Sequence, residues 1–306
     1  LEMSAVPVAL GVFYVFREPQ DQQDFLQART KRLIDWSQIS SRLGLGRPEP
    51  RVRKERPSVY QLHADILEPF WQKLLELGRQ PTEEEFPELG ELKKRLRSAN
   101  RAERLFVQKG GEEELTAAKE RRKGDLMVYL AMSNFRKKVP FKHLSKALKL
   151  DIKCFIGDYK RGLEQGMDLL FAVGDPDEIE IACEEVPIGH QDEQALYVHR
   201  NQLDALPPVL RIYVSCASQL YGDVNQADII KIHKASGKVT FLLYDDFDGK
   251  RLPELQQRIK VDLPRQFVNV FDHSGSGQLL YYKERFMMPD DEGYEDQVKY
   301  GTKLRG

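Results

Sequence analysis

The sequence predicts an α+β fold in which a helical N-terminal half is followed by a mostly antiparallel sheet packed with helices. Up to about residue 185, apolar residues recur at the spacing of helix faces, whereas the later segments alternate with the period of strands. Short turns join the last four predicted strands, which favours antiparallel pairing. The 306 residues, 41% of them hydrophobic, suffice for two domains with their own cores.

An apolar run at residues 5–16, AVPVALGVFYVF, is rich in β-branched and aromatic residues and predicts one fully buried strand. A buried strand needs neighbours on both sides, so we expect Leu1 to be a cut end or an ordered start rather than the biological N-terminus. No basic segment precedes the run and no small-residue cleavage site follows it, which argues against a secretory signal.

Residues 17–58 are predicted to form a helix at 21–36 and a basic linker interrupted by glycine and proline. A basic helical domain is predicted at 59–185, where Thr82 and Glu85 have the spacing of a capping box at a helix start. The helices expected in this domain lie at 60–77, 89–109, 112–122, 125–138, 144–159 and 162–173, with a short one from Asp175.

A sheet domain is predicted at 186–306, interrupted by one clear helix at 207–221. The motif HSGSG at 273–277 predicts a hairpin turn between the last two strands. The strands expected in this domain lie at 195–199, 228–233, 238–244, 258–263, 267–271 and 279–286.

Charge is distributed unevenly along the chain, although the net charge is only −1. Residues 92–162 hold 20 Lys and Arg against 8 Asp and Glu, for a net charge of +12, and both flanking segments are acidic. A cationic segment of this kind favours a polyanionic partner, and DNA is the partner we expect. Two alternatives remain, a solvated basic face and a face that docks on an acidic protein surface.

The predicted nucleic-acid contacts are the clustered basic residues of this segment, because Lys and Arg neutralise phosphates. These are Lys93, Lys94, Arg95, Arg97, Arg101, Arg104, Arg121, Arg122, Lys123, Arg136, Lys137 and Lys138.

Several motifs of known chemistry are missing. No strand leads into a glycine-rich cofactor turn, and there is no P-loop, HExxH or GxSxG motif. The cysteines Cys154, Cys183 and Cys216 form no CxxC pair, which indicates free thiols in a reducing cytoplasm and no zinc site. No apolar run reaches the roughly 18 residues that a membrane span needs. We therefore expect a cytoplasmic protein with no membrane partner, no metal and no cofactor within these residues.

Polar residues at the ends of predicted strands form a second candidate site, provided that the strand ends cluster. Its members are His199, Arg200, Arg211, Lys231, His233, Asp245 and Asp246. If the two histidine strands are neighbours, the rings of His199 and His233 would meet at one sheet edge. Asp245, Asp246 and Asp248 are more typical of a turn than of a metal-dependent nuclease site, which remains the less favoured alternative.

Several ordered motifs resemble the bacterial family of DNA phosphorothioation-associated methyltransferases. They include GDLMVYLAMSNFRKKVPFKHLSKALKLDIKCFIGDYK, GDPDEIEIACEEVPIG, ALYVHRNQLDALPPVLRIYVSCASQLYGDVNQADIIKIHKASGKVTFLLYDDFD and YYKERFMMPD. Upstream, ALGVFYVFREPQDQQDFL and FWQKLLELGRQPTEEEF also fit, so that the resemblance covers nearly the whole chain.

The resemblance implies a Rossmann-like, S-adenosylmethionine-dependent methyltransferase domain of which residues 1–16 of this chain would be the terminal strand. The chain would then be the DNA-engaging and scaffolding C-terminal region of a protein of phosphorothioate-based modification and restriction. S-adenosylmethionine is implied for the missing domain only, so no catalytic residue is assigned here. The alternative is a protein-interaction module that docks other modification or restriction proteins.

Overall fold

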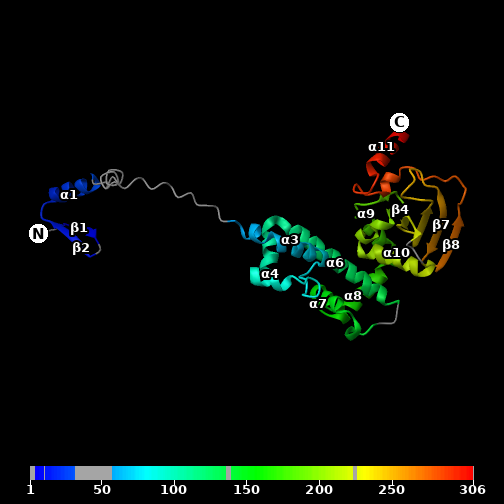
Figure 1. Ribbon diagram of the computed structural model, residues 1–306, viewed down its shortest axis with the longest axis horizontal. Coiled ribbons are helices and arrows are strands. Elements are labelled where there is room, and N and C mark those ends of the chain that lie inside the picture. The colour runs from blue at the N-terminus through cyan, green and yellow to red at the C-terminus, as the bar shows by residue number, and fades with distance from the viewer. Residues whose placement is uncertain (1–3, 10, 32–56, 136–138, 223–225, 306) are drawn as a thin grey trace. The chain divides into compact units, whose positions relative to one another are not determined.

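The computed structural model describes residues 4–9, 11–31, 57–135, 139–222 and 226–305 (Figure 1). The chain divides into two compact units, residues 1–58 and 59–306, and the boundary falls where the basic linker was predicted to end. Most of that linker, and the end of the helix predicted at 21–36, lie outside the described residues.

The first unit contains a hairpin, β1 (Ser4–Ala9) and β2 (Val12–Phe16), followed by helix α1 (Pro19–Lys31). The prediction of one buried strand at 5–16 was wrong, because Gly11 adopts a φ of 78° and turns the chain back on itself. Phe25 of α1 contacts the rings of Tyr14 and Phe16. The side chains from Val12 to Val15 are nevertheless 51–60% exposed, since apolar content alone does not determine burial.

The second unit begins with helices α3 (Val59–Leu77), α4 (Leu89–Leu96), α5 (Ala99–Phe106) and α6 (Glu112–Ser133). Their first core joins Leu67, Phe70 and Leu74 of α3 to Leu92 and Leu96 of α4. Helix α6 is continuous through Gly124, where two separate helices were predicted.

The helix start predicted at Thr82 was wrong, although Thr82 donates its backbone N–H to Glu85 at 2.9 Å as a capping box requires. Residues 83–85 form a turn, and α4 begins only at Leu89. Pro87 disfavours helical geometry at Phe86, and the Glu85 carboxylate binds Arg79 instead of a helix terminus.

Helices α7 (Lys146–Phe155), α8 (Tyr159–Ala172) and α9 (Pro176–Glu184) complete the helical region. Gly162 and Gly166 allow α8 to approach α6 closely, because a Cβ at Gly166 would lie 2.8 Å from the backbone nitrogen of Ala131. Asp175 caps α9 and Pro176 occupies its first turn, as the sequence predicted.

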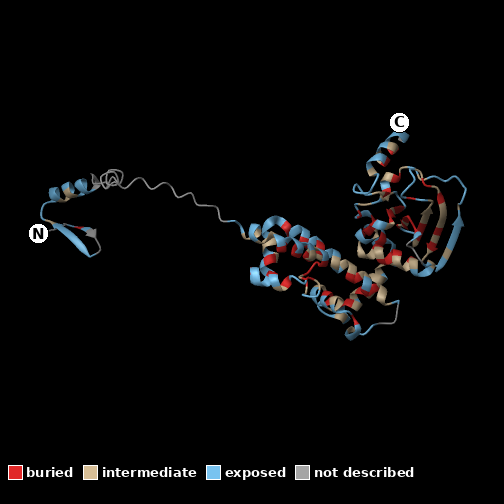
Figure 2. Ribbon diagram, viewed as in Figure 1, coloured by how far each residue is buried: buried red, intermediate tan, exposed pale blue. Residues whose placement is uncertain are grey.

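The sheet has the order β3-β4-β5-β6-β7-β8, and all of its pairs are antiparallel, which confirms the predicted α+β fold. The strands are β3 (His190–Gln191), β4 (Ala195–His199), β5 (Ile229–His233), β6 (Lys238–Tyr244), β7 (Leu255–Asp262) and β8 (Phe267–Asp272). Helices α9 and α10 (Pro208–Tyr221) cover one face, where the buried residues gather (Figure 2).

The strand predicted at 279–286 was wrong, and residues 273–277 therefore do not join two hairpin strands. Leu279 makes a single bridge to Glu254, Tyr282 adopts a φ of 58°, and η5 (Lys283–Phe286) is a short 3-10 helix. This segment buries Phe286 against Ile229 and Phe247. Strand β3 and the final helix α11 (Tyr294–Arg305) were not predicted. No described helix is both long and apolar enough to cross a bilayer.

Candidate nucleic-acid interface

Part of the predicted basic surface is engaged in ion pairs within the protein. Lys93 pairs with Glu83 at 3.1 Å, and Arg95 pairs with Asp65 of α3 at 2.7 Å and with Glu91. These contacts are on the surface, where they contribute little stability but offset the positive charge locally. Lys93 and Arg95 are therefore weaker candidates for phosphate contact than the sequence indicated.

Arg122 belongs to a buried ionic network that joins α6 and α7 to the loop after α3. Asp151 of α7 is 1% exposed and accepts hydrogen bonds from Arg79 Nε at 2.6 Å and from Arg122 Nη2 at 2.7 Å. Arg79 also binds both carboxylate oxygens of Glu85, at 2.7 and 2.9 Å. Its hydrogen bonds hold the pKa of Glu85 at about 2. This geometry assigns Arg122 a structural role.

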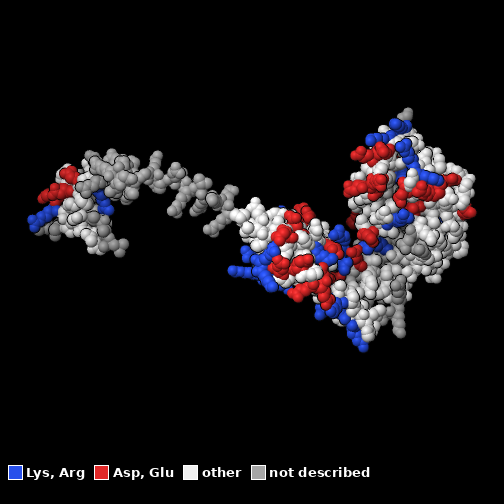
Figure 3. Space-filling view, in the orientation of Figure 1, with Lys and Arg blue, Asp and Glu red and all other residues white. Residues whose placement is uncertain are grey.

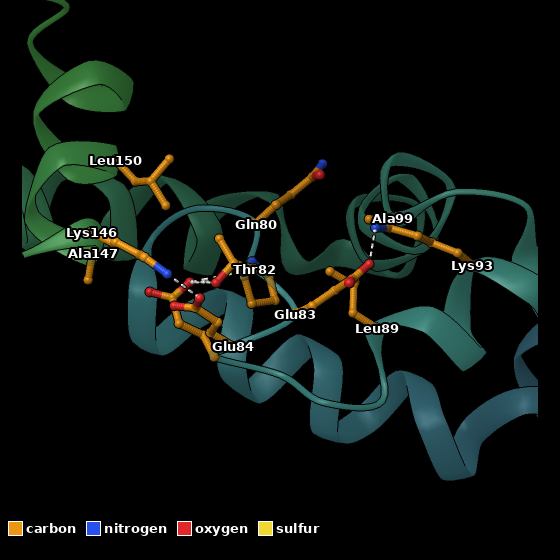
Figure 4. A pocket seen from close by; sticks show the side chains of 12 residues that line it. Gln80, Thr82, Glu83, Glu84, Leu89, Lys93, Ala99, Lys146, Ala147 and Leu150 are labelled. Carbon is orange, nitrogen blue, oxygen red and sulfur yellow. Dashed lines mark hydrogen bonds and ion pairs between the residues drawn. The ribbon is translucent and has the colours of Figure 1, made fainter.

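A pocket of about 580 Å³ lies beside this network, between the 80–85 loop and α7 (Figure 4). Its charged groups already bind one another, since Lys146 pairs with Glu84 at 2.5 Å and Lys93 with Glu83. The lining is therefore of mixed charge and provides no concentrated site for an anion.

Four basic residues of α4 and α5 remain exposed and have no anionic partner among the described residues: Lys94, Arg97, Arg101 and Arg104. Figure 3 shows Lys and Arg atoms gathered over the α4 end of the helical region, with acidic atoms beside them. The two helices meet at Arg97, whose φ of 70° ends α4, and Ser98 caps α5. We call these four residues the α4–α5 cations.

The remaining predicted phosphate contacts differ in their surroundings. Arg121 donates to the carbonyl of Leu75 at 3.4 Å, and Lys123 pairs with Glu120 at 3.8 Å. Arg136, Lys137 and Lys138 lie outside the described residues.

The predicted pairing of His199 and His233 at one sheet edge was wrong. Their strands are neighbours but antiparallel, so His199 lies opposite Ile229 and His233 lies opposite Ala195. The two rings are therefore at opposite ends of the sheet. The polar residues proposed as one site are divided between these two ends.

At the first end, His199 is 5% exposed and its ring stacks on Phe247 at 4.9 Å. Burial and the neighbouring Arg200 lower the pKa of His199. Its Nδ1 accepts a hydrogen bond from the Asn201 N–H, whereas Nε2 is buried with no partner in the described part of the chain. His199 is therefore held neutral, in a setting that packs its ring and positions the next turn.

Arg200 and Arg211 line a cleft of about 470 Å³ between α6 and α10. Both guanidinium groups bind carboxylates: Arg200 binds Asp228 at 3.3 Å, and Arg211 binds Asp125 of α6 at 2.7 Å. The Arg211–Asp125 pair ties the sheet region to the helical region, and both pairs leave little uncompensated positive charge in the cleft.

Asp245 and Asp246 stabilise the turn after β6. Asp245 binds Lys250 and accepts the Glu254 N–H, and Asp246 accepts the Gly249 N–H at 3.1 Å from a backbone with φ of 52°. Their oxygens are thus directed into the turn. Within the described ranges, no group of three or more His, Cys, Asp or Glu side chains is arranged to hold a metal ion.

Lys231 and His233 lie on the sheet face opposite α10. Lys231 donates to the Tyr197 hydroxyl at 2.5 Å, and His233 Nε2 lies 3.1 Å from Thr240 Oγ1. Burial and three nearby lysines lower the pKa of His233 to about 4. The sequence did not indicate that Lys260 joins this group, although its position opposite Thr240 follows from the strand register.

Comparisons of the chain with protein-family models, with curated proteins and with solved structures find no match.

Proposed function

We propose that this chain is the DNA-engaging and scaffolding region of a cytoplasmic protein of DNA phosphorothioate modification, and that it contacts the duplex backbone through the α4–α5 cations. The observation that carries the DNA contact is that Lys94, Arg97, Arg101 and Arg104 are exposed in the single α4–α5 segment without anionic partners among the described residues. Cations without an anionic partner can neutralise DNA phosphates and so release the counterions bound there.

The placement of these cations suits the backbone rather than the bases. Their side chains extend from two short helices, α4 and α5, whose apolar faces are buried against α3. A rigid support of this kind fixes the cations relative to one another and lets them track phosphates, which carry no sequence information. The proposal therefore includes binding that depends weakly on DNA sequence.

The resemblance to DNA phosphorothioation-associated methyltransferases supplies the biological setting of the proposal. S-adenosylmethionine belongs, in this proposal, to a methyltransferase-like domain that precedes residue 1. The buried ionic network holds α6 and α7 together, and the Arg211–Asp125 pair holds α6 against α10, which packs on the sheet; these contacts give the chain its scaffolding character.

The test compares two variants with the same change in net charge. Arg101→Gln/Arg104→Gln removes half of the α4–α5 cations, and Lys299→Gln/Lys303→Gln changes two exposed lysines of α11. Duplex binding is measured by fluorescence anisotropy across a salt series. The first variant should reduce the slope of log K against log salt by about 1.8, which is about 0.9 for each lost phosphate contact.

The α11 variant should leave that slope unchanged. Equal slopes for both variants would refute the assignment to α4–α5. Salt-insensitive binding, or retention of acidic proteins but not of DNA, would favour the alternative of a protein-docking module.

A further inference from the structure

The sheet has one face covered by helices and a second face, which we call the open face, that is exposed on the edge strand β8 but half-buried or buried on β4 to β6. The side chains of Leu196, Ile230, Phe241 and Ile259 face α10 in the core. Because side chains alternate along a strand, their neighbours in sequence face the other way. The buried cluster of Phe247 and Phe286 covers that other face toward its His199 end, and Thr240 on β6 is 3% exposed.

A row of polar residues crosses the open face from one strand to the next. The register places Tyr197 opposite Lys231, Lys231 opposite Thr240, Thr240 opposite Lys260, and Lys260 opposite Asn269. The row beside it begins at His233 and reaches Phe267 through Asp262. Directly opposite side chains in an antiparallel sheet lie about 5 Å apart, so these rows form one continuous surface.

This surface is cationic, although the segment that contains it is acidic. Residues 163–306 hold 15 Lys and Arg against 25 Asp and Glu. The face nevertheless brings together Lys231, Lys238, Lys260 and Arg258, against the carboxylate of Asp262 and that of Asp192 at its margin. The positive charges of Lys231, Lys260 and Lys238 are also among the causes of the lowered pKa of His233.

The cations differ in how far they are already engaged. Lys238 lies 3.7 Å from Asp262, Lys231 donates to Tyr197, and the guanidinium of Arg258 lies 4.6 Å from the centre of the Phe271 ring. Lys260 has no ion-pair or hydrogen-bond partner in the described part of the chain. It lies at the centre of the β6–β8 side of the face, so it is available to a ligand.

Aromatic rings accompany the cations on the edge strand β8. Phe267 is 56% exposed and Phe271 is 38% exposed, and both flank Asn269 on the open face. Exposed phenylalanine rings beside the unengaged Lys260 suit a ligand with both flat rings and negative charges. Nucleic acid has this composition, because its bases stack on aromatic side chains while its phosphates bind lysine and arginine.

The geometry points to a single strand, and we propose that the open face of β4–β8 binds single-stranded nucleic acid, with Lys260 contacting phosphate and Phe267 stacking on a base. Five strands spaced about 4.8 Å apart are about 19 Å across, too wide to enter a duplex major groove of about 12 Å. In a single strand, by contrast, the bases are free to lie flat on a sheet.

This inference does not rest on the proposed duplex contact, because it uses none of the α4–α5 cations. The two surfaces make distinguishable predictions for two substrates and two sets of variants. A protein that fails to bind duplex DNA can still bind a single strand through the sheet, and the reverse also holds.

The experiment measures binding of fluorescein-labelled 12-mers of deoxythymidine and of uridine to the full chain by anisotropy, with a 12-base-pair duplex in parallel. Phe267→Ala should weaken single-strand binding at least fivefold, the lower limit expected for loss of one stacked base. Lys260→Gln should reduce the single-strand salt slope by about 0.7. Neither change should affect duplex binding.

Thermal unfolding of each variant confirms that the fold is retained, and Lys303→Gln on α11 serves as the charge-matched control. Preference for the uridine or the thymidine strand distinguishes RNA from DNA as the ligand. Single-strand binding that is unchanged in both Phe267→Ala and Lys260→Gln would overturn the assignment. Poly-glutamate binding with the same loss in Phe267→Ala would also overturn it, because that ligand has no bases to stack.

Discussion

Removal of the Asp151 carboxylate tests the buried ionic network most severely. Asp151 is 1% exposed and receives Arg79 at 2.6 Å and Arg122 at 2.7 Å. Breaking a buried pair by deleting one partner costs about 3–5 kcal/mol, because a charge is left uncompensated. Arg79 would keep Glu85, and Arg122 is 35% exposed and can regain water. We therefore expect Asp151→Ala to lower the free energy of unfolding by about 3 kcal/mol.

Urea unfolding followed by circular dichroism measures this loss, with Asp65→Ala as the matched control. Asp65 pairs with Arg95 on the surface, where the loss of one pair should cost less than about 1 kcal/mol. A loss below about 1 kcal/mol for Asp151→Ala would refute the argument that the network fastens α7 to the preceding helices. Arg79→Met/Asp151→Leu should be less damaging than Asp151→Ala, because no charge is left buried alone.

Three further changes test other parts of the fold. Arg79 holds the pKa of Glu85 at about 2, below its ordinary value of 4.5, so the stabilisation that ionised Glu85 contributes is complete above about pH 4.5 and is lost as the pH falls through 2. Between pH 6 and pH 2, the free energy of unfolding measured in urea should therefore fall by about 3 kcal/mol more for wild type than for Glu85→Gln. Gly166→Ala should lower the free energy of unfolding, measured by thermal unfolding, by about 1–3 kcal/mol, because its Cβ would lie 2.8 Å from the α6 backbone. Gly90→Ala, whose Cβ would meet nothing within 4 Å, should not lower it. Leu130→Ala, at a fully buried position in the last turn of α6, should lower the free energy of unfolding by about 2–5 kcal/mol in urea unfolding, and a loss below about 1 kcal/mol would contradict its place in the core.

Helices and central strands could be predicted from the sequence where periodicity and end signals agreed. The helix 207–221 and the strands near 195–199 and 238–244 were confirmed almost to the residue. Apolar content without periodicity was less informative: residues 5–16 and 279–286 both contain strand-forming residues, yet each contains a left-handed backbone, at Gly11 and Tyr282. Such local reversals depend on single dihedral angles that composition does not determine.

The candidate sites required strand register and ion pairing, neither of which one sequence provides. His199 and His233 both end strands, but antiparallel pairing separates them. Lys93 and Arg104 look equivalent in the sequence, and only the structure shows that Glu83 binds Lys93. Lys260 was overlooked because the signal that identifies it, its position opposite Thr240, appears only after β6 and β7 are paired.

The most direct test of the proposed DNA contact compares the salt slope of duplex binding between wild type and a variant in which all four α4–α5 cations are glutamine. These cations lack anionic partners among the described residues, so each should contribute about 0.9 to the slope, and the variant should lose about 3.6 in total. A slope reduced by that amount, with thermal unfolding unchanged, would locate the phosphate contacts on α4 and α5. An unchanged slope would contradict the account and assign duplex binding, if any, to another surface.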